Sequence, residues 1–285
     1  MKYPKVSIII PTFNEEKNIK RLLVSIGKQS YKNIESIVVD DGSTDKTVSI
    51  ANKYATRVYA RKHAERSIQR NFGANRAKGD YLVFLDADME LTPNVVLNCI
   101  EIISNSKYKA LIIPEKTTGG SFMSRVRRFE REMYMGDATI EVARFFDKKI
   151  FNEFDGYDVK LTGAEDYDLP YRISKRHKIG WSTEWLLHHE ETLTLPKQLR
   201  KKYYYAAKSA SYAKKHPELI SSQGNMLFRK AYFKNWKKFI FHPILGLTFI
   251  AIRILEATSA ILGYISAVGI NKFLKTLITT IRKKY

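Results

Sequence analysis

Residues 81–88 read YLVFLDAD, a mostly apolar run followed by two aspartates, Asp86 and Asp88. The apolar run is typical of a buried strand, which cannot turn its terminal carboxylates inward without a counter-charge. Two carboxylates one residue apart at a strand end can bind one hard cation and leave coordination positions for phosphate oxygens and water. By itself the motif also fits a solvated turn that caps a helix beginning near Pro93, so its meaning depends on the residues around it.

The eighty residues before this motif alternate between strand and helix patterns. Apolar and β-branched runs predict strands, and apolar side chains three or four residues apart predict helices between them. The predicted strands are 6–10, 34–39, 57–60 and 81–85, and the predicted helices are 14–29, a helix capped by 43–45 that ends at 54, and 66–77. This alternation predicts an α/β fold with a parallel sheet and right-handed crossovers.

Polar pairs follow the first, second and fourth predicted strands, namely Asn14-Glu15, Asp40-Asp41 and Asp86/Asp88. Because ligands of open parallel sheets collect at the carboxyl ends of the strands, we expect these pairs to lie at one edge. An acid after the second strand can accept hydrogen bonds from a base or a ribose, and Gly42 permits a tight turn. Turn and capping chemistry is the alternative, which we expect for Ser43 and Asp45 and, as a helix N-cap, for Asn14.

The segment 110–191 is less regular. It contains predicted strands at 111–113 and 143–146, a glycine-containing loop at 117–121, and predicted helices at 124–135 and 165–175. The last helix begins with Glu165, Asp166 and Asp168. Crowded carboxylates raise one another's pKa, which suits a base that takes a proton from a hydroxyl. Stabilisation of the positive end of the helix is an equally good explanation of the same residues.

Other side chains give weaker signals. Residues 188–191 read HHEE and can supply an imidazole ligand, although a histidine pair is more often surface decoration. Arg70, Asn71 and Arg76 precede the Asp-x-Asp strand and can contact phosphate or base, or lie on a solvated helix face. The single cysteine, Cys99, excludes an internal disulfide, fits a reducing compartment and is expected to be a buried helix residue.

The positive charge is concentrated in the last third of the chain. Of the net charge of +20, +16 falls on residues 197–285, where 18 Lys and Arg face only Glu218 and Glu256. Such a tail can meet nucleic acid or an anionic membrane, and Tyr203–Tyr205 could stack on bases. A nucleic-acid-binding protein has no use for the apolar run that follows, so we expect no nucleic-acid partner.

Residues 239–270 are apolar except for Arg253 and Glu256, and exceed the ~20 residues that span a bilayer. A mid-span charge costs roughly 2.5–3.5 kcal/mol, and the two charges are three residues apart and could pair. Either one span buries this pair, or His242-Pro243 and Gly246 break the run into shorter interfacial helices, the arrangement we favour. The flanking Lys230, Lys234, Lys237 and Lys238 and the series between Lys272 and Lys284 suit anionic headgroups. A hydrophobic dimer helix, and hence an oligomer, is the alternative.

Five motifs in order resemble the family 2 glycosyltransferases with a GT-A fold, a Rossmann-like nucleotide-binding sheet. They are residues 6–16 (VSIIIPTFNEE), 38–45 (VVDDGSTD), 69–74 (QRNFGA), 77–88 (AKGDYLVFLDAD) and 163–169 (GAEDYDL). The resemblance covers about residues 4–195 of the chain. Phe13 stands where tyrosine is common, which removes a hydroxyl but keeps a stacking face. No Gln-x-x-Arg-Trp follows the histidines, so the resemblance is to non-processive members.

The resemblance implies a role for each matched residue. Asp166 would be the catalytic base, and Glu165 would help to place the acceptor or donor sugar. Asp88 would be the main metal ligand, Asp86 would lie on the metal or the sugar nucleotide, and His188 or His189 would complete the site. The nucleotide pocket would contain Pro11, Phe13, Glu15, Asp40, Asp41 and Arg70, with Asp41 on the base.

The resemblance also implies the reaction. A metal-assisted displacement would invert the anomeric carbon of a nucleotide-diphosphate sugar, with Mn²⁺ or Mg²⁺ as cofactor and a UDP-sugar favoured over a GDP-sugar. Membrane attachment suggests a lipid-linked acceptor or a cell-surface glycan precursor. A nucleotidyltransferase on a similar sheet is the alternative, but Pro11-Thr12-Phe13-Asn14 stands where its glycine-rich loop is expected.

We therefore expect a glycosyltransferase domain at 1–196, a basic Tyr/Lys-rich helical region at 197–238 and membrane-associated helices at 239–285. The apolar run at 6–10 is too short for a signal peptide, so we expect the first domain in the cytoplasm. The chain is then held at the cytoplasmic face of the cell membrane, as a monotopic or single-span protein.

Overall fold

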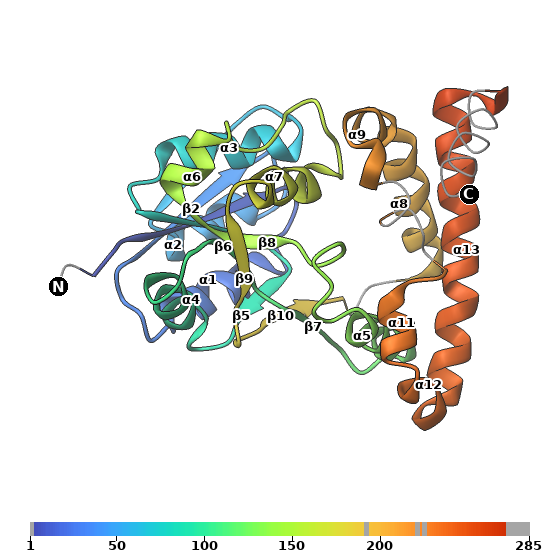
Figure 1. Ribbon diagram of the computed structural model, residues 1–285. Coiled ribbons are helices and arrows are strands. Elements are labelled where there is room, and N and C mark those ends of the chain that lie inside the picture. Colours follow the sequence, from blue (N-terminus) through green and yellow to red (C-terminus); the bar gives the residue numbers. More distant parts are fainter. Residues whose placement is uncertain (1–2, 191–193, 220–222, 224–226, 272–285) are drawn as a thin grey trace. The chain divides into compact units, whose positions relative to one another are not determined.

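The computed structural model of the 285-residue chain describes residues 3–190, 194–219, 223 and 227–271 (Figure 1). The chain forms two compact units, and each is described by itself. The first comprises Met1–Thr118, Glu141–Val159 and Glu165–Glu190, and the second comprises Gly119–Ile140, Lys160–Ala164 and Glu191–Tyr285. Glu191 and the basic series between Lys272 and Lys284 lie outside the described residues.

A seven-stranded sheet in the order β3-β2-β1-β4-β8-β6-β9 forms the centre of the first unit. Its strands are β1 (Val6–Thr12), β2 (Ile34–Asp40), β3 (Arg57–Ala60), β4 (Tyr81–Phe84), β6 (Tyr108–Ile112), β8 (Ala143–Asp147) and β9 (Lys178–Trp181). All neighbouring strands are parallel except β8, which runs antiparallel to β4 and β6. The predicted α/β fold with a mainly parallel sheet is confirmed.

The register of this sheet gathers polar residues at one edge. Thr12 pairs with Asp40, so β1 and β2 end together, and β4 ends three residues earlier, where Ile9 pairs with Phe84. The three predicted polar pairs follow these strand ends. The antiparallel β8 begins where β4 ends, because its Phe145 pairs with Val83. Strand β8 therefore brings the side chain of its second residue, Arg144, to the same edge.

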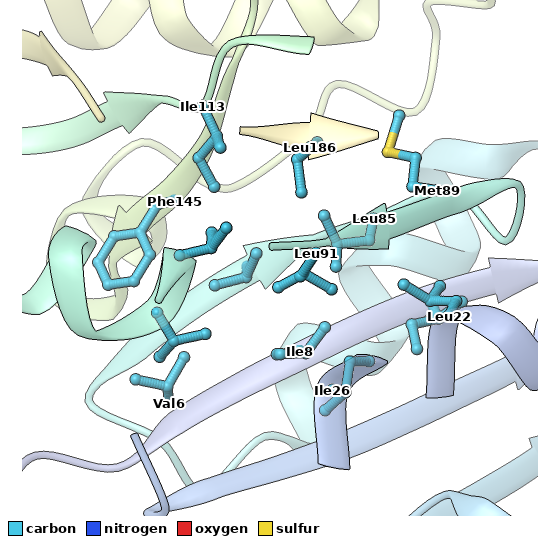
Figure 2. Packing of buried hydrophobic residues seen from close by; sticks show 14 of the residues in the cluster. Val6, Ile8, Leu22, Ile26, Leu85, Met89, Leu91, Ile113, Phe145 and Leu186 are labelled. Atoms are coloured by element: carbon cyan, nitrogen blue, oxygen red, sulfur yellow. The ribbon is translucent and has the colours of Figure 1, made fainter. Parts of the chain in front are cut away.

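Successive side chains of β1 enter two different cores, as the period of a strand requires. Ile8 and Ile10 join the core that contains residues of α1 (Ile19–Gly27), α2 (Thr47–Tyr54) and α4 (Val95–Ser104), and Figure 2 shows Ile8 of this core near Ile26 of α1. Cys99 of α4 is buried in this core, as predicted. Ile9 joins the core that contains residues of α3 (Arg66–Arg76), α6 (Lys148–Glu153) and α7 (Glu165–Ser174).

The loop between β1 and α1 differs from the sequence prediction. Helix α1 begins at Ile19, and Asn14 has a positive φ of 53°, so the prediction of Asn14 as its N-cap is wrong. The Asn14 backbone N–H donates to the Ser43 hydroxyl, and its side-chain oxygen accepts from the Thr44 N–H. Asn14 thus ties the end of β1 to the turn after β2.

A small sheet of three short strands was not predicted. Its order is β5 (Met89–Leu91), β10 (Leu186–His189) and β7 (Glu115–Thr118), with β10 antiparallel to β5 and parallel to β7. Strand β7 includes the first two residues of the loop predicted at 117–121, so the predicted start of that loop is wrong. Pairing of His188 with Met89 holds β10 beside the Asp-x-Asp motif.

The second unit is helical over its described residues. It contains α5 (Phe122–Met133), α8 (Leu195–Lys208), α9 (Ala210–Lys215), the 3₁₀ helix η1 (Pro217–Leu219), α11 (Lys230–Lys234), α12 (Lys237–Phe241) and α13 (Pro243–Val268). The predicted helical region at 197–238 is not one helix, and its first helices, α8 and α9, are divided by a turn at Ser209. Phe129 of α5, Tyr232 of α11 and Phe249 of α13 belong to one apolar core.

Helix α13 is a single helix of 26 residues, long and apolar enough to cross a membrane by length and composition. His242-Pro243 marks its start, as expected of a proline in the first turn. The predicted break at Gly246 is wrong, because Gly246 lies inside the helix, where a Cβ atom would fall 2.6 Å from the Phe239 ring. The predicted pairing of Arg253 with Glu256 is confirmed.

Candidate active site

Arg70 lies at the centre of the polar edge of the sheet. Its side chain is fully buried, and its Nη2 atom lies 3.1 Å from Asp86 Oδ1. Its Nη1 atom pairs with Asp166 and lies 3.4 Å from Glu165 Oε1. The Asp-x-Asp motif and the Glu-Asp pair, 80 residues apart in the sequence, therefore contact one guanidinium. The alternative that Arg70 lies on a solvated helix face is wrong, whereas Arg76 is exposed.

Arg144 continues this network on the other side of Asp86. Its Nη2 atom lies 3.6 Å from Asp86 Oδ2 and 2.7 Å from Glu115 Oε1. Burial alone would raise the pKa of Asp86, but Arg66, Arg70 and Arg144 together hold it well below its usual range. Asp86 is therefore an ionised acid among arginines and not a solvated helix cap.

His188 joins the network to Asp88. Its Nδ1 atom lies 3.0 Å from Glu115 Oε2, and its Nε2 atom lies 3.1 Å from Asp88 Oδ2. Successive residues of a strand face opposite ways, and His189 accordingly contacts Glu90 at 2.8 Å and Thr118 at 2.9 Å. The predicted imidazole beside Asp88 thus belongs to His188, and a purely decorative role for this histidine pair is wrong.

These contacts form one chain of acidic, arginine and histidine side chains that runs from Asp166 at the start of α7 to Asp88 between β4 and β5. Each member has an oppositely charged or imidazole neighbour. In order, the chain is Asp166, Arg70, Asp86, Arg144, Glu115, His188 and Asp88. Both ends of the chain carry carboxylates that are partly exposed, with 22% of the Asp166 side chain and 34% of the Asp88 side chain accessible. The accessible carboxylates of this chain therefore lie at its two ends, and the charged groups between them are paired with one another.

The three acids at the start of α7 have different surroundings. Burial raises the pKa of Glu165, and the neighbouring Asp166 adds to the rise, as the crowding predicted. The Oε2 atom of Glu165 is buried and has no hydrogen-bond partner among the residues that the structure describes. Asp168 instead points away into a 2.8 Å ion pair with Arg172, one turn along the helix. A buried, unsatisfied acceptor such as this Glu165 oxygen suits a ligand hydroxyl.

The turn after β2 separates the roles of its two aspartates. Asp40 Oδ2 accepts hydrogen bonds from the N–H groups of Gly42 and Ser43, so its carboxylate builds the tight turn. Asp41 Oδ1 accepts from the Ala64 N–H at 2.7 Å and from Gln69, and His63 lies 2.7 Å from Oδ2. Asp41 is thus fixed in position by a helix and a loop, and only the His63 partner is largely exposed.

The residues of the first motif lie beside this turn. Phe13 is half exposed, and its ring centre lies 5.4 Å from that of His63. Burial raises the pKa of Glu15 against a hydrogen bond from Asn18, and the charges of Asp88 and Asp86 raise it further. Pro11 is partly buried at the end of β1. Glu15 is therefore within electrostatic reach of the Asp-x-Asp motif.

Sequence reasoning missed Arg144, Glu115 and His63. A signal existed for Arg144, because one arginine stands in the apolar run Ala143–Asp147, and a buried charge requires a partner. Glu115 lies on a four-residue strand, and His63 lies in a loop, so neither has a periodic pattern that marks it.

The sequence of the chain is similar to those of known glycosyltransferases. The sequence model of glycosyl transferase family 2 matches residues 7–158, more than half of the chain. An uncharacterized glycosyltransferase of Haemophilus influenzae is 39% identical over 94 residues, which are 31% of this chain and 38% of that protein. An uncharacterized glycosyltransferase of Rickettsia typhi is 28% identical over 204 residues, 65% of this chain and 63% of that protein. The chain thus spans less than two thirds of the length of these relatives.

Two solved structures share the fold at low sequence identity. S. aureus TarS 1–349 in complex with UDP-GlcNAc has a TM-score of 0.59 and 19% identity, over 89% of this chain and 81% of that chain. The mannosyltransferase PcManGT of Pyrobaculum calidifontis, in complex with GDP-Man and Mn²⁺, has a TM-score of 0.59 and 17% identity, over 100% and 82%. They show a GT-A-like α/β fold, and with the match over residues 7–158 the chain belongs to glycosyl transferase family 2.

Proposed function

We propose that the chain is an inverting glycosyltransferase that moves a sugar from a nucleotide-diphosphate sugar to an acceptor hydroxyl. One observation carries this proposal: the buried guanidinium of Arg70 contacts both Asp86 and Asp166. Two acids with different expected tasks, one on the donor side and one as base, therefore meet at a single point. Direct displacement with inversion needs one such base and one means of stabilising the leaving group.

Asp166 would take the proton from the acceptor hydroxyl while the hydroxyl oxygen bonds to the anomeric carbon and the bond to the diphosphate breaks. Its contact with Arg70 holds the carboxylate in one orientation, which favours a defined path of attack. The unsatisfied Oε2 atom of Glu165 would accept a hydrogen bond from a hydroxyl of the acceptor or donor sugar.

Asp88 and His188 would hold a divalent cation, Mn²⁺ or Mg²⁺, with Asp86 beside it. When bound, such an ion neutralises the charge that develops on the leaving diphosphate. The donor set fits, because an imidazole nitrogen and a carboxylate oxygen face each other at 3.1 Å. Within the described ranges no group of three or more His, Cys, Asp or Glu gathers as a metal site. Two protein ligands leave positions for diphosphate oxygens.

The nucleotide would bind between the first motif and the turn after β2. Phe13 offers an exposed ring face, and Asp41 would accept a hydrogen bond from the base in place of the exposed His63. Pro11, Glu15 and Asp40 would shape the same pocket. The UDP-GlcNAc complex of TarS supports a UDP-sugar, and the GDP-Man complex of PcManGT supports a GDP-sugar as the second candidate.

The acceptor would be lipid-linked or a precursor of a cell-surface glycan, at the cytoplasmic face of the cell membrane. The support is the apolar helix α13 together with the basic residues of the second unit. A protein held at a membrane can meet acceptor substrates that cannot leave the bilayer.

The test is a transfer and hydrolysis assay with UDP-GlcNAc, other UDP-sugars and GDP-Man, each with Mn²⁺, Mg²⁺ or EDTA. We expect metal-dependent release of the nucleoside diphosphate from one donor, and its loss in Asp88→Ala and Asp166→Asn. Glu101→Gln, at an exposed acid of α4, is the matched control and should stay active. Full activity of both site variants would show that the proposed mechanism is wrong.

A further inference from the structure

The charged residues of α13, Arg253 and Glu256, form buried ion pairs and hydrogen bonds within the second unit. Arg253 Nη1 lies 2.8 Å from Glu130 Oε1 of α5, and Arg253 also pairs with Glu256. Glu256 is fully buried and accepts a hydrogen bond from Gln198 of α8. These contacts fasten one face of α13 to two helices that are themselves polar.

A spanning orientation of α13 would carry these two helices into the hydrocarbon. Helix α5 alone has six charged residues, Arg125, Arg127, Arg128, Glu130, Arg131 and Glu132. Each charge at the centre of a bilayer costs roughly 2.5–3.5 kcal/mol. The packing of α13 on α5 and α8 therefore favours a helix that lies along a membrane surface over one that crosses it.

The residues around the start of α13 include seven exposed apolar or aromatic side chains between positions 228 and 247, which we call the docking face. Each of its side chains is 53–74% exposed, although all are large and apolar or aromatic. The docking face comprises Phe228, Phe233, Trp236, Ile240, Phe241, Ile244 and Leu247. Soluble monomers rarely expose apolar patches of this kind unless a partner covers them.

Along the chain, basic residues lie between the residues of the docking face. Residues 227–247 contain five basic residues and no acid, namely Arg229, Lys230, Lys234, Lys237 and Lys238. Tryptophan and phenylalanine beside lysine are typical of the interface between lipid headgroups and acyl chains. In a symmetric dimer through this face the like charges of two copies would meet, which opposes a second copy as the partner.

We propose that the docking face rests on the surface of an anionic phospholipid bilayer, with α11, α12 and the first turns of α13 entering the headgroup region. The inference rests on the membrane position proposed above and assigns it to residues 228–247. Lys230, Lys234 and Lys237 would contact lipid phosphates, while Lys238 stays paired with Glu132 of α5 and the apolar side chains reach the upper acyl chains.

The test is flotation of the full-length protein with vesicles of pure phosphatidylcholine or with added phosphatidylglycerol, without any nucleotide sugar. We expect binding that depends on the anionic lipid. Lys230→Gln/Lys234→Gln/Lys237→Gln should weaken binding to the anionic vesicles on the order of 100-fold, since each lysine contributes about a factor of five. Phe233→Ser/Phe241→Ser/Leu247→Ser should abolish binding. The matched control, Lys28→Gln/Lys53→Gln/Lys107→Gln, removes three exposed lysines of the first unit and should bind like wild type.

A second measurement covers the case in which the apolar variant fails to fold. In a Trp181→Phe/Trp185→Phe background, Trp236 fluorescence should be quenched by lipids brominated near the glycerol end of the acyl chain. No quenching, or wild-type flotation of both docking-face variants, would overturn the proposal. So would dimers that dissociate in the apolar variant, or binding lost only when the lysines between Lys272 and Lys284 are replaced. Because flotation needs no donor sugar, inactive protein that still floats would contradict only the catalytic proposal.

Discussion

The Nε2 atom of His188 lies 3.1 Å from Asp88 Oδ2, while its Nδ1 atom lies 3.0 Å from Glu115 Oε2. A carboxylate on one side of a histidine fixes the ring orientation and increases the basicity of the other nitrogen. Glu115, which is itself held by Arg144, therefore determines which nitrogen of His188 faces Asp88.

The first prediction concerns Glu115→Gln. The variant keeps the shape of the side chain but weakens the hold on His188, so we expect Mn²⁺ affinity in the presence of UDP to fall by about 10- to 100-fold. Electron paramagnetic resonance of free Mn²⁺ measures this directly, without turnover. His189→Gln is the control, because His189 faces Glu90, and its Mn²⁺ affinity should equal that of wild type. Wild-type affinity in Glu115→Gln would show that the Glu115 carboxylate does not support metal binding through His188.

The second prediction separates two aspartates that are two residues apart. Asp166→Asn removes the proposed base and should lower kcat by about 10²- to 10⁴-fold, with the Kd for the nucleotide unchanged. Asp168→Asn breaks its buried pair with Arg172 and should instead destabilise the protein by about 3 kcal/mol. Calorimetric nucleotide binding, turnover and denaturant unfolding are measured on both. A large loss of kcat in folded Asp168→Asn and none in Asp166→Asn would reverse the assignment.

The sequence predicted the central sheet well because its strands lie between amphipathic helices with clear periods. The four-residue strands β3 and β4 were predicted, but β5, β7, β9 and β10 were missed, because polar residues or glycine interrupt or end each of them and no longer apolar run marks them. The site shows the same limit. Each acid after β2 and β4 was found from the strand before it, but the contact of Asp88 with His188 joins residues 100 positions apart. Arg144 reaches the site only because β8 runs antiparallel to β4, and the direction of a strand in its sheet cannot be predicted from the residues of that strand alone.

The third prediction concerns acid stability. Burial alone would raise the pKa of Glu130, but Arg127 and Arg253 lower it to about 2. A carboxylate with a lowered pKa in the folded state stabilises it above the unfolded value of about 4.5 and loses that contribution as the pH falls toward 2. We therefore expect the free energy of unfolding to drop between about pH 5 and pH 2, by at most roughly 3 kcal/mol from this group. Glu130→Gln should flatten the pH dependence in denaturant titrations, and an unchanged slope would contradict the assignment.

The last prediction concerns Arg253 and distinguishes a packed helix from a membrane span. Arg253→Met leaves Glu130 and Glu256 buried without their shared cation, so we expect a loss of about 3–5 kcal/mol in the free energy of unfolding. Replacing all three charges, in Glu130→Gln/Arg253→Met/Glu256→Gln, should restore part of this loss, because no buried carboxylate is left without its cation, while Arg127 and Lys202, which lose these acid partners, are partly exposed. In a helix that crosses the bilayer, removing Arg253 would favour insertion, and the single variant would be at least as stable as wild type. Thermal unfolding of the three proteins in the same mild detergent therefore gives opposite signs for the two arrangements.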